Sequence, residues 1–161
     1  MTLRYASMRQ SDLDEVIELE RAIYTHPWTR GNFADALAAG NHGWLVREDG
    51  KLVGYCVVML APDDAHLLNI SVAGHAQGRG IGRGLLEWVH ALAQAHGLES
   101  VLLEVRVSNE RAIRLYEKAG YIPIGKRRDY YPAINGREDA IVMRKYLEGP
   151  PARLPQEAVA G

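Results

Sequence analysis

Residues 65–97 read AHLLNISVAGHAQGRGIGRGLLEWVHALAQAHG, and they contain the strongest signals for the fold of the chain. Its first eight residues, AHLLNISV, form an apolar run typical of a strand. From Ile81 onward, apolar residues recur every three or four positions, which predicts a helix that ends at Gly97. Between them lies QGRGIGRG, residues 77–84. The stretch therefore predicts a strand, a glycine-rich loop and a helix in succession.

The residues that follow complete a crossover connection. SVLLEV, residues 100–105, is a short apolar strand, so it is expected to lie parallel to the strand before the loop. A helix capped by Ser108 or Asn109 and ended by Gly120 comes next. Residues 121–147 then read as two strands around an Asn-Gly turn.

The residues that precede the stretch predict a meander of antiparallel strands. LRYASM, residues 3–8, reads as a strand, and two helices follow, the first capped by Ser11 and the second spanning residues 29–39 with Thr29 as its cap. GWLVRED and KLVGYCVVMLA flank an Asp-Gly pair, which is a strong hairpin signal. The element order β-α-α-β-β-β-α-β-α-β-β predicts an α+β fold with a mixed sheet.

The composition is that of an ordinary globular domain. The chain has 161 residues, 47% of them hydrophobic and 24% charged, with a formal net charge of −1. This balance gives no electrostatic footprint for nucleic acid, and the apolar runs are too short to span a membrane. The first residues have no signal-peptide core. We therefore expect a cytoplasmic monomer that binds neither nucleic acid nor membrane.

The last thirteen residues differ in composition from the rest. GPPARLPQEAVAG, residues 149–161, contains three of the seven prolines and little periodicity. This predicts a disordered tail after a single domain spanning residues 1–148.

Cysteine and histidine usage argues against metal and thiol chemistry. Cys56 is the single cysteine and lies inside an apolar strand, which favours an inert core residue over a nucleophile. None of the six histidines pairs with another at a spacing typical of metal ligands. We expect no metal.

The glycine loop has two interpretations from its residues alone. A loop without side chains before a helix allows backbone N–H groups and the helix dipole to bind a phosphate, but glycines also simply form turns. The loop matches neither the P-loop pattern nor the dinucleotide pattern G-x-G-x-x-G.

Two motifs in order carry a resemblance to a known family. Gln77 to Gly82 fit Q-x-x-G-x-G, and residues 109–121, NERAIRLYEKAGY, fit N-x-x-A-x-x-L-Y-x-x-x-G-F/Y. Together they resemble the GNAT acetyltransferase family over residues 1 to about 146. The resemblance implies a mixed, mostly antiparallel sheet of about seven strands with helices on both faces, and acetyl-CoA as co-substrate.

Further stretches resemble one subgroup of that family. They are His26-Pro27-Trp28, LLNISV, LEVRVSN, RRDYYP and GREDAIVM. They are similar to the subgroup that acetylates the N-terminal alanine of small-subunit ribosomal protein eighteen, which implies a ribosomal protein N-terminus as the acceptor. A GNAT enzyme acting on a small amine or on lysine, and a non-catalytic acyl-CoA-binding module, are the alternatives.

The resemblance also implies which residues bind acetyl-CoA. Its backbone contacts would come from one strand and from the glycine loop, where N–H groups would meet the pyrophosphate. Asn109 caps a helix, contacts the cofactor, or does both. The candidate binding residues are Ile70, Ser71, Val72, Gln77, Gly78, Arg79, Gly80, Ile81, Gly82, Arg83, Asn109 and Tyr116.

Glu104 and Tyr116 are the candidate catalytic residues. An α-amine has a pKa of about 7.7–8.0, so acetyl transfer at neutral pH needs a base, and the departing thiolate needs an acid. Glu104 stands in an apolar strand and is the candidate base, through a water or with a raised pKa, unless it merely pairs with Arg106. Tyr116 is the candidate acid implied by the resemblance, and packing on its helix is the alternative. Direct attack in a ternary complex is expected.

The acceptor groove is the least defined part of the site. His26, Trp28 and the Tyr130-Tyr131-Pro132 segment are candidate walls, because aromatic loop residues often line grooves. Asp129, Glu138 and Asp139 either attract a basic residue beside the acceptor alanine or are ordinary charges near the Asn-Gly turn.

Overall fold

The computed structural model describes residues 2–149 and 157–160 and has the predicted α+β architecture. The element order agrees with the sequence analysis, with one additional short strand near the C-terminus. The elements are β1 (Leu3–Ser7), α1 (Leu13–Ile23), α2 (Arg30–Ala38), β2 (His42–Glu48), β3 (Lys51–Leu60), β4 (Asp64–Val72), α3 (Ile81–Ala95), β5 (Ser100–Arg106), α4 (Glu110–Lys118), β6 (Ile122–Ala133), β7 (Gly136–Tyr146) and β8 (Ala158–Ala160).

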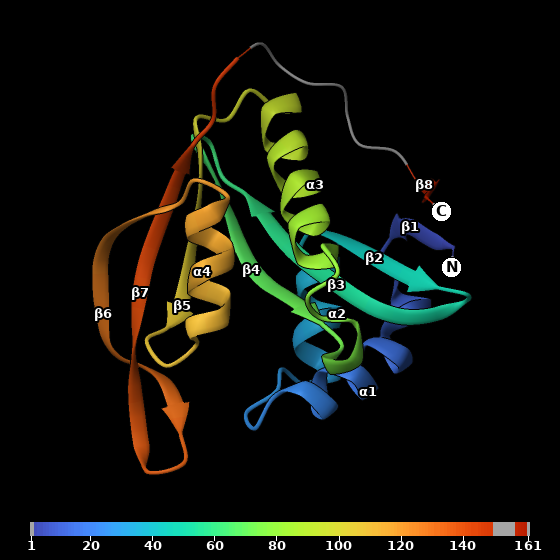
Figure 1. Ribbon diagram of the computed structural model, residues 1–161, viewed down its shortest axis with the longest axis horizontal. Helices are drawn as coiled ribbons and strands as arrows, with labels where there is room; N and C mark the ends of the chain where they lie inside the picture. The colour runs from blue at the N-terminus through green and yellow to red at the C-terminus, as the bar shows by residue number, and fades with distance from the viewer. Residues whose placement is uncertain (1, 150–156, 161) are drawn as a thin grey trace.

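The strands form one twisted sheet in the order β6-β7-β5-β4-β3-β2-β1-β8. Among the described strands, β4 and β5 form the one parallel pair, as the crossover through α3 requires. Helices α1 and α2 lie on one face of the sheet, and α3 and α4 cover the other (Figure 1). The mixed sheet with helices on both faces confirms the predicted fold class.

Two hydrophobic cores follow from this layering. Val89, Leu92 and Tyr116 pack with β-strand residues under α3 and α4. Leu13, Val16 and Phe33 pack against the opposite face of the sheet, under α1 and α2. The central strand β3 is buried over Leu52 to Val58 because it contributes to both cores.

Local sequence signals account for most element ends. Thr29 caps α2 by accepting a hydrogen bond from the Asn32 backbone at 3.0 Å, and Gly97 and Gly120 end α3 and α4 with positive φ. The first helix is different. A 3₁₀ turn, Gln10–Asp12, precedes α1, and the Asp12 carboxylate accepts from the Arg9 backbone, so Ser11 is not the cap.

The predicted tail is partly ordered. Residues 150–156 and 161 lie outside the described residues. Ala158–Ala160, in contrast, form β8 and pair antiparallel with Leu3 to Tyr5 of β1. These three residues therefore differ from the predicted disorder. The edge of β1 presents unpaired backbone N–H and C=O groups, and an extended segment can form hydrogen bonds with them.

Strands β4 and β5 separate along their length, and this separation positions the site. They pair only from Asp64 to Leu67 on β4, opposite Ser100 to Leu103 on β5. Leu68 is then an extra residue in the β3–β4 ladder, because Val57 pairs with Asn69 and Val58 with Leu67. A bulge bends the strand that carries it. Beyond Leu67, the backbone of β4 therefore faces a gap instead of a neighbouring strand.

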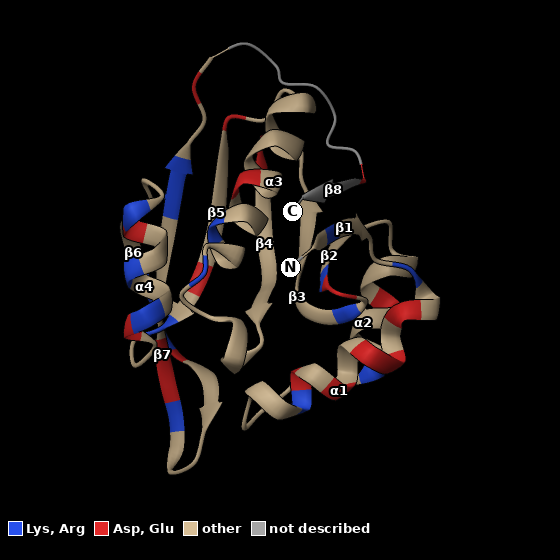
Figure 2. Ribbon diagram, turned by 45° about the vertical axis from the view of Figure 1, so that its right-hand side comes forward, with Lys and Arg blue, Asp and Glu red and all other residues tan. Residues whose placement is uncertain are grey.

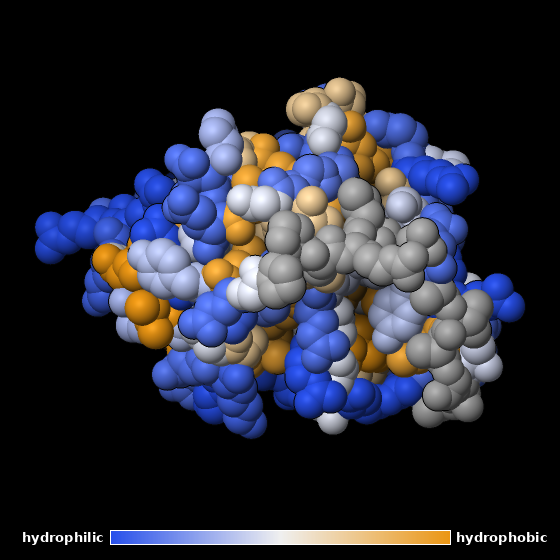
Figure 3. Space-filling view, turned by 90° about the horizontal axis from the view of Figure 1, so that it is seen from above, coloured by the Kyte–Doolittle hydropathy of each residue, from blue (hydrophilic) through white to orange (hydrophobic). Residues whose placement is uncertain are grey.

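The surface is charged and mixed. Basic and acidic residues both occur on the helices and on β7 (Figure 2). On the face seen in Figure 3, hydrophobic side chains are interrupted by hydrophilic ones. Within residues 2–149 and 157–160, no helix has both the length and the apolar character needed to cross a membrane.

Candidate active site

A cavity of about 610 Å³ opens where β4 and β5 separate. Its walls come from β4, β5, the N-terminus of α4, the α1–α2 loop and the end of β6. Pockets of this size hold small ligands, usually with a few polar groups fixed in an apolar lining. The lining includes Glu20, Tyr24, His26, Trp28, Leu67, Asn69, Ile70, Leu103, Glu104, Arg106, Asn109, Tyr116, Tyr131 and Pro132.

Glu104 reaches this cavity from β5 and is held from two other strands. His66 Nε2 on β4 lies 2.5 Å from Glu104 Oε2, and Arg127 Nε on β6 lies 3.2 Å from Oε1. The side chain of Glu104 is only 8% exposed. Arg106, the partner considered from sequence, instead pairs with Glu138 at 3.2 Å. The interpretation of Glu104 as a charge paired to Arg106 is therefore wrong.

The environment of Glu104 favours its ionised form. Burial by itself raises the pKa of the Glu104 carboxyl, but His66 and Arg127 outweigh burial and hold this pKa below its usual value. The carboxylate is thus present at neutral pH. A raised pKa, one of the two conditions considered from sequence, is not what the structure has.

Tyr116 reaches the cavity from the opposite side of β5. Leu103 and Val105 belong to the core with Tyr116, so strand alternation turns Glu104 to the other face of the sheet. Both side chains nevertheless line the cavity, because the separated strands leave a passage through the sheet. Burial raises the pKa of the Tyr116 phenol, with smaller contributions from Tyr24, Tyr121 and Tyr131. The phenol is therefore protonated at neutral pH.

The glycine loop forms an uncapped helix N-terminus beyond the end of β4. Gly80 occupies the N-cap position of α3 with φ of 84°, and no side chain caps the helix there. A Cβ at Gly82 would lie 3.1 Å from Leu115 Cδ2, so glycine also allows α3 and α4 to pack closely. The first N–H groups of α3 lack a side-chain cap, which fits an anion such as a pyrophosphate.

The two loop arginines differ in their surroundings. Arg79 forms an ion pair with Glu48 of β2, so it ties the loop to the end of that strand. Arg83 lies 3.7 Å from Glu87 one turn along α3 and is 74% exposed. Arg111 of α4 approaches the loop as well, since a Cβ at Gly78 would lie 3.4 Å from its Nη2. Neither Glu48 nor Arg111 was singled out from sequence, because both contacts join distant segments.

The backbone of β4 faces the gap at two carbonyls. The Tyr24 hydroxyl donates to the Ile70 carbonyl and Gln77 Nε2 donates to the Val72 carbonyl, each at 3.2 Å. The Ser71 side chain, in contrast, turns away from the gap, and its Oγ donates to the Asn69 side chain at 2.8 Å. Exposed strand groups of this kind accept an extended ligand as an added strand.

One of the residues that line the cavity is a buried carboxylate that the sequence analysis did not single out. Glu20 of α1 is 2% exposed and accepts three hydrogen bonds, from the Tyr55 hydroxyl at 2.6 Å, the Asn69 amide at 3.2 Å and the Trp28 backbone at 2.9 Å. It thereby ties the α1–α2 loop, which forms one wall of the cavity, to β3 and β4. In the sequence, Glu20 is one residue of a helix face that mixes apolar and polar positions. Its role in joining the loop to the sheet is therefore visible only from its hydrogen bonds in the structure.

Replacing Glu20 by alanine is expected to destabilise the fold by about 2 kcal/mol, because three buried donors lose their acceptor. The free energy of unfolding from urea denaturation checks this. Glu18→Ala, two residues earlier on the exposed side of α1, is the control and should change stability by less than about 0.5 kcal/mol. Equal stability of the two variants would contradict the role assigned to Glu20.

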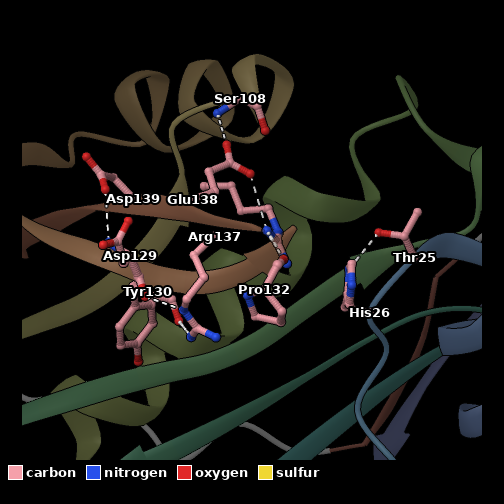
Figure 4. Close-up of polar contacts among 10 residues, drawn as sticks. Thr25, His26, Ser108, Asp129, Tyr130, Pro132, Arg137, Glu138 and Asp139 are labelled. Atoms are coloured by element: carbon pink, nitrogen blue, oxygen red, sulfur yellow. Dashed lines mark hydrogen bonds and ion pairs between the residues drawn. The ribbon is translucent and has the colours of Figure 1, made fainter. Parts of the chain in front are cut away.

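The β6–β7 hairpin forms another wall, and polar contacts within it and with the end of β5 hold it in place (Figure 4). Glu138 accepts from the Ser108 backbone at 2.8 Å and pairs with Arg106, while Asp139 accepts from the Asp129 backbone at 2.9 Å. Arg106 in turn donates to the Pro132 carbonyl at 2.8 Å and lies over the Tyr131 ring. Glu138 and Asp139 thus shape the hairpin.

The candidate acceptor walls are largely brought together. His26, Trp28, Tyr131 and Pro132 all line the cavity. Tyr130 instead packs edge-on against Tyr131, with the Arg127 guanidinium 5.6 Å from its ring centroid.

Asn109 and Cys56 lie as their sequence context predicts. Asn109 lines the cavity and caps α4, accepting from the Ala112 backbone at 3.2 Å. Cys56 is fully buried, and burial raises the pKa of its thiol, which leaves it unreactive. Across the described part of the chain, no three His, Cys, Asp or Glu side chains are grouped to bind a metal.

The family model described as the Acetyltransferase (GNAT) family matches residues 13–121, and the chain belongs to that family.

Within it, the chain is similar to enzymes named ribosomal protein bS18-alanine N-acetyltransferase (RimI). It is 35% identical to that of Escherichia coli strain K12 over 138 residues, covering 86% of this chain and 93% of the relative. A relative in Bacillus subtilis, named as a putative enzyme of this activity, is 37% identical over 139 residues, covering 85% and 91%. The crystal structure of the Escherichia coli enzyme superposes with a TM-score of 0.85, at 33% identity, covering 91% of this chain and 95% of the other. The predicted family and subgroup are confirmed.

Proposed function

We propose that this protein transfers the acetyl group of acetyl-CoA to the N-terminal α-amine of a protein, namely the alanine that begins ribosomal protein bS18. The observation that carries the proposal is the meeting of an ionised Glu104 and a protonated Tyr116 in one cavity, lined by the strand β4 that leads through the glycine loop to the uncapped N-terminus of α3. The named activity of relatives that match most of the chain supports the acceptor. Such an acceptor also favours a cytoplasmic location.

Acetyl-CoA would lie along the gap between β4 and β5. Its pyrophosphate would meet the N–H groups of the loop and the first turn of α3, Gln77 to Arg83, and its pantetheine would follow Ile70 to Val72 as an added strand. The thioester would then lie at the passage through the sheet, between Glu104 and Tyr116, with Asn109 beside it.

The reaction is direct attack within a ternary complex. Glu104, acting directly or through a water molecule, removes a proton from the acceptor ammonium. The amine attacks the thioester carbonyl carbon, a C–N bond forms and the C–S bond breaks. Tyr116 donates its proton to the departing thiolate, and the second proton, which the nitrogen gives up on becoming an amide, restores the phenol. Cys56 is buried in the core, so an acetyl-cysteine intermediate has no accessible nucleophile.

The test of this function is a competition among acceptors. The purified protein is incubated with acetyl-CoA and peptides beginning Ala-Arg, in parallel with polyamines and with lysine peptides whose N-terminus is blocked. We expect acetylation of the Ala-Arg peptide at its α-amine, read by mass spectrometry. Preferential turnover of a polyamine or of lysine would favour a different GNAT activity, and binding of CoA without turnover of any amine would favour a non-catalytic module.

Arg79→Ala is expected to raise the KM for acetyl-CoA by no more than about threefold, because backbone N–H groups supply most of a helix N-terminal anion site. Its ion pair with Glu48 ties the loop to β2, so the loss comes from a looser loop. Steady-state kinetics with varied acetyl-CoA measures it. Gly80→Val is the comparison and should raise this KM far more, because valine is strained at φ of 84°. A larger effect from Arg79→Ala would mean that its side chain, not the backbone, carries the binding.

A further inference from the structure

The contact between His66 and Glu104 has no part in the reaction proposed above. The Nε2 and Oε2 atoms lie 2.5 Å apart, which is a short hydrogen bond. Glu104 lines the cavity, whereas His66 is not among the described residues that do so, and its side chain is 26% exposed against 8% for Glu104. His66 therefore contacts both the buried carboxylate and the solvent.

His66 and Arg127 hold the two oxygens of the carboxylate separately. His66 on β4 takes Oε2 and Arg127 on β6 takes Oε1, so the carboxylate on β5 is fixed between flanking strands. An ionised carboxylate has about four lone-pair directions, and two single contacts leave others for a proton from the cavity. A base held in this way keeps the geometry that proton transfer requires.

The two partners differ in one respect. An arginine stays charged at every accessible pH, whereas an imidazole changes charge between about pH 5 and 8. A neutral imidazole with its proton on Nε2 still donates to Oε2. An imidazolium adds a positive charge beside the carboxylate and makes it a weaker base.

We propose that His66 is a positioning residue that orients Glu104 and sets its strength as a base according to the pH of the solution. This inference rests on the proposed function, in which Glu104 removes the proton of the acceptor amine. Because His66 is the more exposed of the two, it stays in contact with the solution even when both substrates fill the cavity. Neutral His66 gives the active base, and acid conditions weaken it.

The surroundings of the pair hold few other titratable groups. Met59, which pairs with His66 from β3, is not titratable, and Leu102 and Val142 are the apolar neighbours in the β-ladder on β5 and β7. The charged and titratable groups that face the pair are Asp64 on β4, Arg106 on β5, Arg127 and Tyr131 on β6, and Arg144 on β7.

The test compares His66→Ala and His66→Gln with the wild type in saturating acetyl-CoA and Ala-Arg peptide. Alanine removes the contact and should lower kcat about tenfold with little change in KM. Glutamine retains an N–H donor but cannot titrate, so its kcat at pH 8 should lie within about threefold of the wild type. The ratio of wild-type to His66→Gln kcat should then fall as the pH is lowered from 8 to 5.5. This ratio cancels the titration of the acceptor amine.

His90→Gln is the matched control, because His90 bonds Tyr121 under α3 and should leave the pH dependence of kcat unchanged. A constant ratio across the pH range, or wild-type kcat in His66→Ala, would overturn the inference. The NMR signals of the His66 ring add a readout independent of turnover, and they should shift in Glu104→Gln, where the carboxylate that contacts the ring is lost. Unchanged ring signals overturn the inference, whereas a wild type that acetylates no amine contradicts the proposed function instead.

Discussion

Glu104→Gln is expected to lower kcat for the Ala-Arg peptide by about 10²–10³-fold, because general base catalysis typically contributes a factor of this size. The amide keeps the shape of the carboxylate and can still bond His66 and Arg127, but it cannot accept the acceptor's proton. The affinity for acetyl-CoA should hardly change, since the proposed cofactor contacts lie on β4 and the α3 loop. Steady-state kinetics and calorimetric titration with acetyl-CoA measure the two quantities.

The control for this variant makes the same chemical change at another glutamate. Glu117→Gln alters an exposed carboxylate on α4, next to Tyr116 in sequence but on the outer side of the helix, and should leave kcat within about twofold. Raising the pH tests the chemistry further. A peptide whose α-amine is already deprotonated needs the base less. The difference in kcat between the wild type and Glu104→Gln should therefore become smaller at alkaline pH. Wild-type kcat in Glu104→Gln would exclude Glu104 as the base.

Much of the fold was predictable because its signals are local. The Asp49-Gly50 pair adopts positive φ at both residues, as the hairpin turn requires, and Thr29 and Asn109 cap the helices that follow them. These features depend on backbone conformation within a few residues, which the sequence determines directly. Strand β8 depends instead on an edge provided by β1, more than 150 residues earlier, and composition alone predicted disorder for it.

The sequence predicted which residues form the site, but it did not predict which side chains contact them. Glu104 stands out in the sequence because a carboxylate in an apolar strand is costly unless it is paired or functional. Tyr116 was predicted as the acid from the family resemblance. The nearest charge in sequence, Arg106, is two positions along β5, whereas the observed partners His66 and Arg127 come from β4 and β6. Which side chains meet across a sheet depends on register, and the bulge at Leu68 and the separation of β4 from β5 are not encoded in any short pattern.

Tyr116→Phe is expected to lower kcat by about 10²-fold while leaving KM for both substrates nearly unchanged. The phenol is buried and its pKa is raised above its usual value, so in the wild type it keeps its proton at the neutral pH of the assay. Phenylalanine fills the same space in the core under α4 but has no proton for the departing thiolate. Single-turnover acetyl transfer, followed by release of free CoA thiol, measures the loss directly.

Tyr121→Phe separates this catalytic role from packing. Tyr121 belongs to the same core as Tyr116, its ring centroid lies 5.8 Å from that of Tyr116, and its exposed fraction is 2%. Its hydroxyl, however, forms a hydrogen bond of 2.8 Å with His90 of α3. Tyr121 is not one of the described residues that line the cavity. Removing the hydroxyl should therefore cost about 1 kcal/mol of stability and leave kcat within about twofold. If both phenylalanine variants lost stability and activity alike, Tyr116 would be a packing residue, and the acid would have to be sought elsewhere in the cavity or in a bound water molecule.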